Sequence, residues 1–313
     1  MKTRTGSRFE EASINLRFDI PKNMESRIAK KLDGHVDINM RISLDMSPVI
    51  GLSIEVDNQA EDHRLRLLVP QNLASNKSIA DVQFGKLERN VYDEAVEVWE
   101  SEKWDEKPDP IYPFLSYVRS ANDEGLGVLT NSVREFEFIN GSEKYDTLAI
   151  TIYRSFGKQG RRDLLRRPGR ASGTSQPTPD SQLLGKNTYE LAMTSDLENI
   201  AELAKQYVSP VVSYSSDPAE DLLLNKSNID VPLNYSLLNV DKSVILLSAI
   251  KKAEADEGLC LRLYNSSADS QKLKVNSVLK IAIELMLDES EKKAISGSVI
   301  EFKPFEIKTL KLK

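Results

Sequence analysis

Hydrophobic and polar residues alternate along most of the chain. The clearest runs cover residues 14–20, 36–46, 65–69, 148–152 and 279–287. Because successive side chains of a β-strand point to opposite faces, each run offers one apolar face to a core. Helical spacing is scarce. The pattern therefore predicts an all-β protein built from packed sheets.

One stretch departs from this period and predicts a short helix over residues 195–207. Ser195 and Glu198 have the spacing of a capping box, in which each side chain accepts a hydrogen bond from an otherwise unpaired backbone N–H. Pro210 ends the pattern, and residues 208–221 have the composition of an extended linker. We expect this helix to connect two β regions.

Composition limits the class of protein. The formal charge is -6 and the pI is about 5.3, which argues against nucleic-acid binding. A single cysteine, Cys260, cannot form an internal disulfide. Residues 1–18 contain no apolar signal core, and no apolar run approaches the roughly 20 residues of a membrane span. We expect a cytoplasmic protein that binds neither nucleic acid nor membranes.

Only two histidines are present, His35 and His63, so a metal site built on several imidazoles is excluded. Asp57 and Asp62 lie close to His63 in sequence and could bind a metal, although a charged strand entry is the more ordinary interpretation. The motifs of nucleotide-binding loops, nucleophile elbows, zinc proteases and CxxC sites are all absent.

The segment GRRDLLRRPGRASG, residues 160–173, lies in a long loop rich in Gly, Pro, Ser and Arg that spans 157–182. Its arginines are Arg161, Arg162, Arg166, Arg167 and Arg170. Guanidinium groups carry a permanent charge and present a fork of donors that suits carboxylates, phosphates and vicinal sugar hydroxyls. The loop could therefore form a polar pocket. Alternatively, its arginines are solvated or pair with acidic residues of a neighbouring surface.

Two further groups of residues could contact a sugar. Trp99, Trp104, Tyr112 and Phe114 could form a stacking platform, although aromatic side chains more often fill cores. Glycoside cleavage needs two carboxylates on either side of a bond. The candidates on composition alone are Asp62, Asp123, Glu124, Glu135, Asp163 and Asp180, and the sequence does not say which of them face each other.

Several segments together resemble the C-terminal β region of the family-38 glycoside hydrolases, the α-mannosidases, with the bacterial branch and its mannosylglycerate hydrolase-like enzymes most similar. The segments occur in one order along nearly the whole chain: 57–70, 84–90, 99–138, 147–157, 161–173, 178–193, 247–265 and 301–312. The resemblance implies a large supersandwich similar to galactose mutarotase over residues 1–194. A short helix and linker would follow over 195–220, and a smaller β-sandwich portion, which could instead complete the supersandwich, over 221–313.

The resemblance also implies what this chain does not carry. Family members have an N-terminal β/α barrel, where a zinc ion sits on two histidines and two aspartates, one of which is the nucleophile of retaining cleavage. The two histidines here match no zinc motif of the family, so we expect no catalytic residue, metal ligand or cofactor in this chain. We expect it to be inactive alone, to pack against that catalytic barrel, and to form an oligomer or a self-associating monomer in isolation.

In the family, at least one arginine-bearing loop of the β region reaches the substrate sugar. By resemblance, the candidate contacts to a mannose-containing saccharide are Arg162, Arg166, Arg167, Arg170 and, more weakly, Tyr112. A cluster of guanidinium groups would suit a mannoside that carries a carboxylate or phosphate. Two alternatives stay open: a stand-alone carbohydrate-binding module that uses Trp99 and Trp104, and a mutarotase-like enzyme that would rely on His63.

Overall fold

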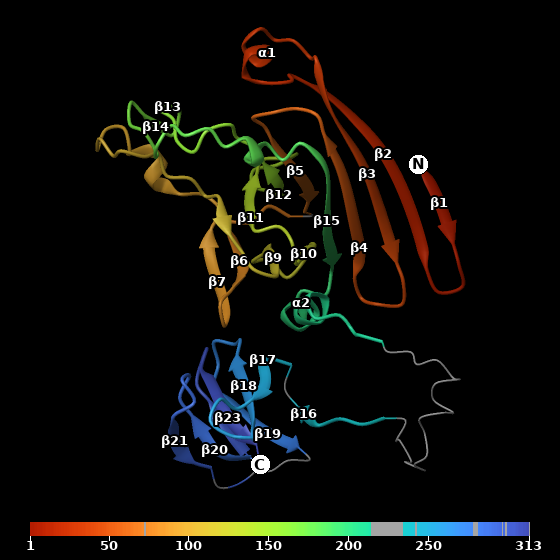
Figure 1. Cartoon of the computed structure of the whole chain (residues 1–313), viewed down its shortest axis with the longest axis vertical. Helices are drawn as coiled ribbons and strands as arrows, with labels where there is room; N and C mark the ends of the chain where they lie inside the picture. Colours follow the sequence, from red (N-terminus) through yellow and green to blue (C-terminus); the bar gives the residue numbers. More distant parts are fainter. Residues whose placement is uncertain are drawn as a thin grey trace. The chain divides into compact units, whose positions relative to one another are not determined.

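The computed structural model describes residues 1–71, 73–213, 234–241, 243–277, 281–295, 297 and 299–312. It confirms the all-β prediction, and its strands form several antiparallel sheets (Figure 1). The chain divides into two compact units: residues 1–83 with 87–200, and residues 84–86 with 201–313. Residues 214–220 of the predicted linker and residues 279–280 of the last alternating run lie outside the described residues. The sequence-based domain boundaries stay a prediction.

The first unit contains a nine-stranded sheet in the order β1-β2-β3-β4-β15-β10-β9-β6-β7. Its strands are β1 (Lys2–Thr5), β2 (Glu10–Ile20), β3 (Gly34–Leu44), β4 (Ile50–Asn58), β6 (Lys77–Val82), β7 (Gly85–Asn90), β9 (Tyr117–Ser120), β10 (Gly127–Thr130) and β15 (Gly185–Thr194). In β4, Leu52, Ile54 and Val56 are buried while the residues between them are more exposed. The period of two thus sets which face meets the core.

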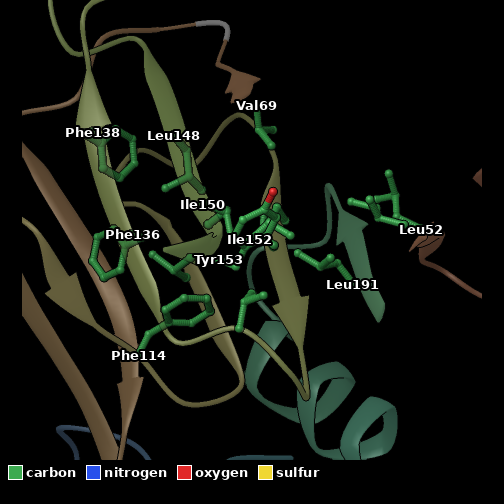
Figure 2. Close-up of a cluster of buried hydrophobic side chains, with 14 of the residues drawn as sticks. Leu52, Val69, Phe114, Phe136, Phe138, Leu148, Ile150, Ile152, Tyr153 and Leu191 are labelled. Atoms are coloured by element: carbon green, nitrogen blue, oxygen red, sulfur yellow. The ribbon is translucent and has the colours of Figure 1, made fainter. Parts of the chain in front are cut away.

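A second, four-stranded sheet packs on the large one. Its order is β5-β12-β11-β8, with β5 (Arg64–Pro70), β8 (Tyr112–Pro113), β11 (Glu135–Ile139) and β12 (Thr147–Arg154). Figure 2 shows Phe136 and Phe138 of β11 beside Ile150 of β12, with Leu191 of the large sheet on the other side of the core. The face of this sheet that points away from the core carries the candidate functional site.

Helices are short in the described parts of the chain. They are α1 (Met24–Ile28), α2 (Ile200–Val208) and the 3-10 turns η1 (Glu94–Glu97) and η2 (Pro179–Gln182). The connector helix forms, but it begins at Ile200, so the predicted capping box at Ser195 is wrong. Asp196 accepts a hydrogen bond from the Asn199 backbone N–H, and Thr194 accepts one from the Asp196 N–H. These local side-chain bonds hold 194–199 in turns rather than in helix.

The second unit is a smaller sandwich of two sheets. The three-stranded sheet contains β16 (Leu238–Val240), β19 (Gln271–Ser277) and β22 (Val299–Phe302). The five-stranded sheet contains β17 (Ile245–Lys252), β18 (Leu259–Asn265), β20 (Ile281–Leu285), β21 (Glu291–Ala294) and β23 (Ile307–Leu312). Leu261, Leu263 and Leu310 from the larger of these sheets meet Leu273 and Phe302 from the smaller one in a fully buried core.

Candidate functional site

The arginine-rich loop folds into a small hairpin, β13 (Asp163–Leu164) with β14 (Arg167–Pro168). At its neck, a Cβ on Gly160 would lie 2.6 Å from the Gly173 backbone, so the two strands of the loop approach this closely only because residue 160 is glycine. The Lys107 N–H donates to the Arg166 carbonyl at 2.7 Å. This bond ties the hairpin to the acidic, proline-rich segment 105–111.

Between the hairpin and the outer face of the four-stranded sheet lies a cavity of about 730 Å³, which we call the arginine cavity. That volume is within the range of about 300–1,000 Å³ usual for ligand pockets. The side chains that line it are Met24, Glu106, Lys107, Asp109, Ile111, Glu135, Arg154, Arg161, Asp163, Leu164, Leu165, Arg166, Arg167 and Ser172. Five of these are basic and four are acidic, so the lining has a formal excess of one positive charge.

The arginines of the loop pair with acidic side chains. Arg161 donates to Asp163 at 2.8 Å within the hairpin. The other pairs join the hairpin to segment 105–111: Arg166 with Asp109, Arg167 with Glu106, and Arg170 with Asp105. Pairing with the acidic residues of a neighbouring surface is one of the alternatives that the sequence left open. The loop therefore presents donors and acceptors side by side rather than an unbalanced positive charge.

The ion pairs and the burial of the loop shift the pKa values of two of its side chains. The hydrogen bond from Arg161 lowers the pKa of Asp163 to about 2. Burial lowers the pKa of Arg166, and the nearby charge of Arg64 lowers it further. Both side chains still carry their charges near pH 7. The Arg167 Nε atom is buried and has no hydrogen-bond partner within the described residues, so it is a donor to which a bound ligand could offer an oxygen.

The floor of the cavity continues along the outer face of the four-stranded sheet. Glu135 accepts hydrogen bonds from Arg154 at 2.9 Å and from the Thr151 hydroxyl at 2.7 Å. Two residues further along β11, on the same face, Glu137 accepts a hydrogen bond from Arg66 at 3.0 Å. A second cavity of about 490 Å³ adjoins the first, with Lys107, Asp109, Leu165 and Arg166 shared between them. A polar groove with alternating charges thus runs across this face.

The structure brings together only part of the predicted sugar-contact set. Arg166 and Arg167 line the arginine cavity. Arg162 and Arg170 are exposed and do not line it. Tyr112 is half-buried in β8, where its ring packs 6.0 Å from that of Phe136 and under the Arg89 guanidinium.

Sequence reasoning missed several residues of the cavity: Glu106, Lys107, Asp109 and Arg154. Glu135 and Asp163 had been candidates only on composition. The alternation of β11 could have identified Glu135, because Phe136 and Phe138 face the core and place Glu135 on the outer face. The acidic segment 105–111 had a weaker signal, which was its charge opposite to that of the arginine loop.

Other candidate residues lie elsewhere. Trp99 is buried and Trp104 is exposed, and neither lines the two cavities. His63 Nε2 is 2.7 Å from the Tyr153 hydroxyl, and burial lowers the pKa of His63. His63 does not line either cavity. Asp62 accepts from the Gly157 N–H at 2.8 Å and so anchors the base of the arginine loop.

The described residues contain no group of three or more His, Cys, Asp or Glu side chains that could hold a metal ion. In the same parts of the chain, no helix has the length and apolar character needed to cross a membrane. We therefore derive no step through a metal from this chain's own residues.

Comparison with known proteins supplies the family. The profile of the "Glycosyl hydrolases family 38 C-terminal beta sandwich domain" matches residues 244–310. The whole chain superposes on a family-38 glycosyl hydrolase from Enterococcus faecalis with a TM-score of 0.78 at 17% identity. Residues 244–310 thus match a family-38 domain, and the whole chain shares its fold with a family-38 protein. The resemblance that the sequence segments carried is confirmed.

Two further proteins are similar to the chain over part of their own length. An α-mannosidase from Enterococcus faecalis has a TM-score of 0.77 at 17% identity, and the match covers 100% of this chain and 35% of that one. The first Enterococcus structure is covered over 36% of its length. A protein of Halalkalibacterium halodurans named "Putative mannosylglycerate hydrolase" is 26% identical over 295 residues, 91% of this chain and 30% of that protein. The chain thus spans about a third of the length of these relatives.

Proposed function

We propose that this family-38 region forms one wall of the substrate pocket of a larger α-mannoside hydrolase. The observation that carries the proposal is the arginine cavity, because it combines a ligand-sized volume with convergent polar groups on a rigid sheet. The arrangement rests on Glu135, Arg154 and the ion-paired hairpin rather than on loose surface arginines. In this proposal the groups that cleave the glycosidic bond, including the zinc ion, belong to the rest of the enzyme.

The chemistry of the wall suits a sugar ring. Vicinal hydroxyls each donate and accept, so they are matched best by neighbouring donors and acceptors. The Arg166–Asp109 and Arg167–Glu106 pairs offer such neighbours, and Leu165 adds an apolar surface. With an excess of one positive charge only, the lining favours hydroxyl recognition over the binding of a highly charged anion. The chain alone is expected to hydrolyse no mannoside.

The test uses the complete enzyme that carries this region. Arg167→Ala should lower kcat/KM for mannosides roughly 10- to 100-fold, because a hydrogen bond from a charged donor is worth about 1.5–3 kcal/mol. Arg170→Ala is the matched control, since Arg170 lies in the same loop but outside the cavity. Equal kinetics for both variants and the wild type would remove the pocket-wall role.

A second candidate is an anionic mannoside as the preferred substrate. The exposed Arg162 favours it, and so does the name of the Halalkalibacterium relative, which refers to mannosylglycerate. If this is correct, Arg166→Ala should weaken turnover of an anionic mannoside more than turnover of a neutral one. Unchanged discrimination between the two substrates would leave hydroxyl recognition as the role of the wall.

A further inference from the structure

The second cavity, which adjoins the arginine cavity, has a different chemistry, and we call it the tyrosine cavity. Its volume of about 490 Å³ lies within the range of about 300–1,000 Å³ usual for ligand pockets. Its lining includes the side chains of Tyr92, Val96, Pro108, Pro110 and Tyr145. It therefore offers aromatic surface, whereas no aromatic residue of the described chain lines the arginine cavity.

The two tyrosines form a contacting pair at the wall of this cavity. Their ring centroids are 6.0 Å apart. The Lys144 ammonium contacts both rings, at 5.5 Å from the centroid of Tyr92 and 5.3 Å from that of Tyr145. The Tyr92 hydroxyl donates to Glu97, and this bond raises the pKa of Tyr92 to about 12. The Tyr92 phenol therefore stays neutral near pH 7.

The backbone of Tyr145 has a φ of 57°, a left-handed conformation that is uncommon for a bulky residue. Asn140 accepts a hydrogen bond from the Tyr145 N–H at 3.1 Å. Asp146 accepts from the N–H groups of Gly141 and Glu143, at 2.7 Å each. Glycine or asparagine would adopt this conformation with less strain. Backbone geometry alone thus does not account for a tyrosine here, and its ring both packs against the main core and lines the tyrosine cavity.

The charged groups of the tyrosine cavity favour an uncharged ligand. The lining has a formal excess of one negative charge, because its acidic side chains are Asp93, Asp109 and Glu137 and its basic side chains are Lys107 and Arg166. A carboxylate or phosphate would meet a net like charge in this cavity. Hydroxyl groups both donate and accept, so they would find matching partners among these neighbouring acidic and basic groups.

We propose that the tyrosine cavity is a second sugar subsite, which binds a neutral pyranose ring next to the sugar at the arginine cavity. The two cavities adjoin through four shared residues, Lys107, Asp109, Leu165 and Arg166. A pyranose ring has apolar C–H faces and a rim of hydroxyls. The tyrosine rings and the two prolines match the faces, and polar groups such as Asn140 match the rim.

This inference rests on the proposed function, because it takes the arginine cavity as the neighbouring sugar site. It deepens that function by naming the substrate class. The substrate is an α-mannoside of at least two sugar units, and its second ring carries no charge. An α-mannoside with a small anionic group in place of the second ring would leave the tyrosine pair without a ligand.

The test compares two substrates of the complete enzyme that carries this region: an α-linked mannose disaccharide and methyl α-mannoside, which has no second ring. Tyr145→Asn removes the aromatic ring and introduces a residue that tolerates the left-handed backbone. The variant should lower kcat/KM roughly tenfold for the disaccharide and change it less than about twofold for the methyl mannoside, because only the disaccharide reaches the tyrosine cavity. Retained turnover of the methyl mannoside also shows that the variant is folded.

Trp104→Ala is the matched control, since Trp104 is an exposed aromatic residue that lines neither cavity. It should change kcat/KM for neither substrate. Equal losses on both substrates for Tyr145→Asn would assign the ring to folding, and no loss on either would remove its contact with a sugar. A larger loss on mannosylglycerate than on the disaccharide would mean that the ligand is anionic. Each of these three results would overturn the proposal.

Arg167→Ala keeps the second subsite apart from the pocket wall. Arg167 lines the arginine cavity but not the tyrosine cavity, so this variant should lower kcat/KM for both substrates. That result without a disaccharide-specific loss for Tyr145→Asn would reject the second subsite and keep the wall. A disaccharide-specific loss for Tyr145→Asn with unchanged kinetics for Arg167→Ala would support the tyrosine cavity as a sugar site and reject the wall at Arg167.

Discussion

The two units each carry a network of charged side chains, but the two networks differ in burial. In the first unit, Arg166 and Asp109 meet at the open arginine cavity, with 51% and 20% of their side chains exposed. In the second unit, Lys308 and Glu284 meet with only 7% and 2% exposed. Water can replace Asp109 at the half-exposed Arg166 guanidinium, whereas most of the Asp109 side chain is buried. In the second pair, removal of one partner leaves a charge without solvent.

The comparison separates a structural charge cluster from a candidate binding surface. Glu284 accepts from Lys308 at 3.3 Å and from Lys292 at 2.7 Å, and Lys308 also reaches Glu306 at 3.1 Å. The charged groups of Glu284, Lys292, Lys308 and Glu306 are thus bonded to one another. The arginine cavity keeps an open volume and a buried donor, Arg167 Nε, without a partner in the described chain. Variants of the two networks can test this difference between a buried charge cluster and an open candidate binding surface.

The largest effect is expected from Glu284→Gln. The change leaves Lys308 with one carboxylate instead of two in a buried site, which should lower the free energy of unfolding of the second unit by about 3 kcal/mol. Both tryptophans lie in the first unit, so tryptophan fluorescence would not report this loss. Amide hydrogen exchange of β18 and β23, measured with increasing urea, provides the readout.

Glu301→Gln is the matched control for this prediction. Glu301 pairs with Lys272 at 2.9 Å, but both side chains are more than two thirds exposed. Its removal should leave exchange in β18 and β23 unchanged. If the two variants lose equal stability, burial is not what distinguishes the charge clusters.

A fall in pH should also test the contribution of the Glu284–Lys308 cluster to the stability of the second unit. Burial opposes ionisation of Glu284, but the bond from Lys292 and the charge of Lys308 hold its pKa below the ordinary value of 4.5. A carboxyl group with a lowered pKa stabilises the fold above its unfolded pKa, and this contribution disappears as the pH falls through the folded pKa. The wild type should therefore lose stability of the second unit below about pH 4.5, and Glu284→Gln should show a flatter acid dependence.

Asp163 provides the contrast within this pH experiment. Its pKa is also lowered, to about 2, by Arg161, but its side chain is 65% exposed. Asp163→Asn should leave the acid unfolding of the first unit as it is in the wild type. An acid dependence removed by Asp163→Asn would show that the exposed pairs stabilise the fold as the buried ones do.

An intermediate effect is expected at Tyr153. Its hydroxyl is bonded to His63 Nε2 at 2.7 Å in the first unit, and burial raises its pKa, so it stays neutral over the usual pH range. Tyr153→Phe should lower the free energy of unfolding by about 1 kcal/mol, because one buried hydrogen bond is lost. Tyr112→Phe is the control, since its ring packs on Phe136 and no side-chain bond of its hydroxyl is present in the described residues. Urea unfolding followed by tryptophan fluorescence measures both.

The fold was largely predictable because strand alternation is a local signal. Runs such as 36–46 and 65–69 place their apolar residues on one face, as the sequence indicates. The run over 281–285 shows the limit. The sequence puts Ile281, Ile283 and Leu285 on one face, but an irregularity between Ile281 and Ile283 changes the register. Ile281 then packs in the main core of the second unit, and Leu285 in a separate cluster beside Cys260.

The site was less predictable because it depends on contacts between distant segments. The arginine loop was recognisable from its composition, but which arginine lines a cavity depends on where segment 105–111 crosses the hairpin. Arg166 and Arg170 lie in the same loop, but Asp109, the partner of Arg166, lines the arginine cavity, and Asp105, the partner of Arg170, does not. A one-dimensional pattern does not encode that crossing.

The smallest effect on stability is expected from Arg166→Ala, and it tests the comparison most directly. Arg166 is half-exposed and its pair with Asp109 lies at an open cavity, so its loss should lower the free energy of unfolding of the first unit by less than about 1 kcal/mol. The same variant should nevertheless change turnover in the complete enzyme. A loss of stability comparable to that of Glu284→Gln would mean that the Arg166–Asp109 pair stabilises the fold. The charged side chains of the arginine cavity would then serve folding rather than the binding of a ligand.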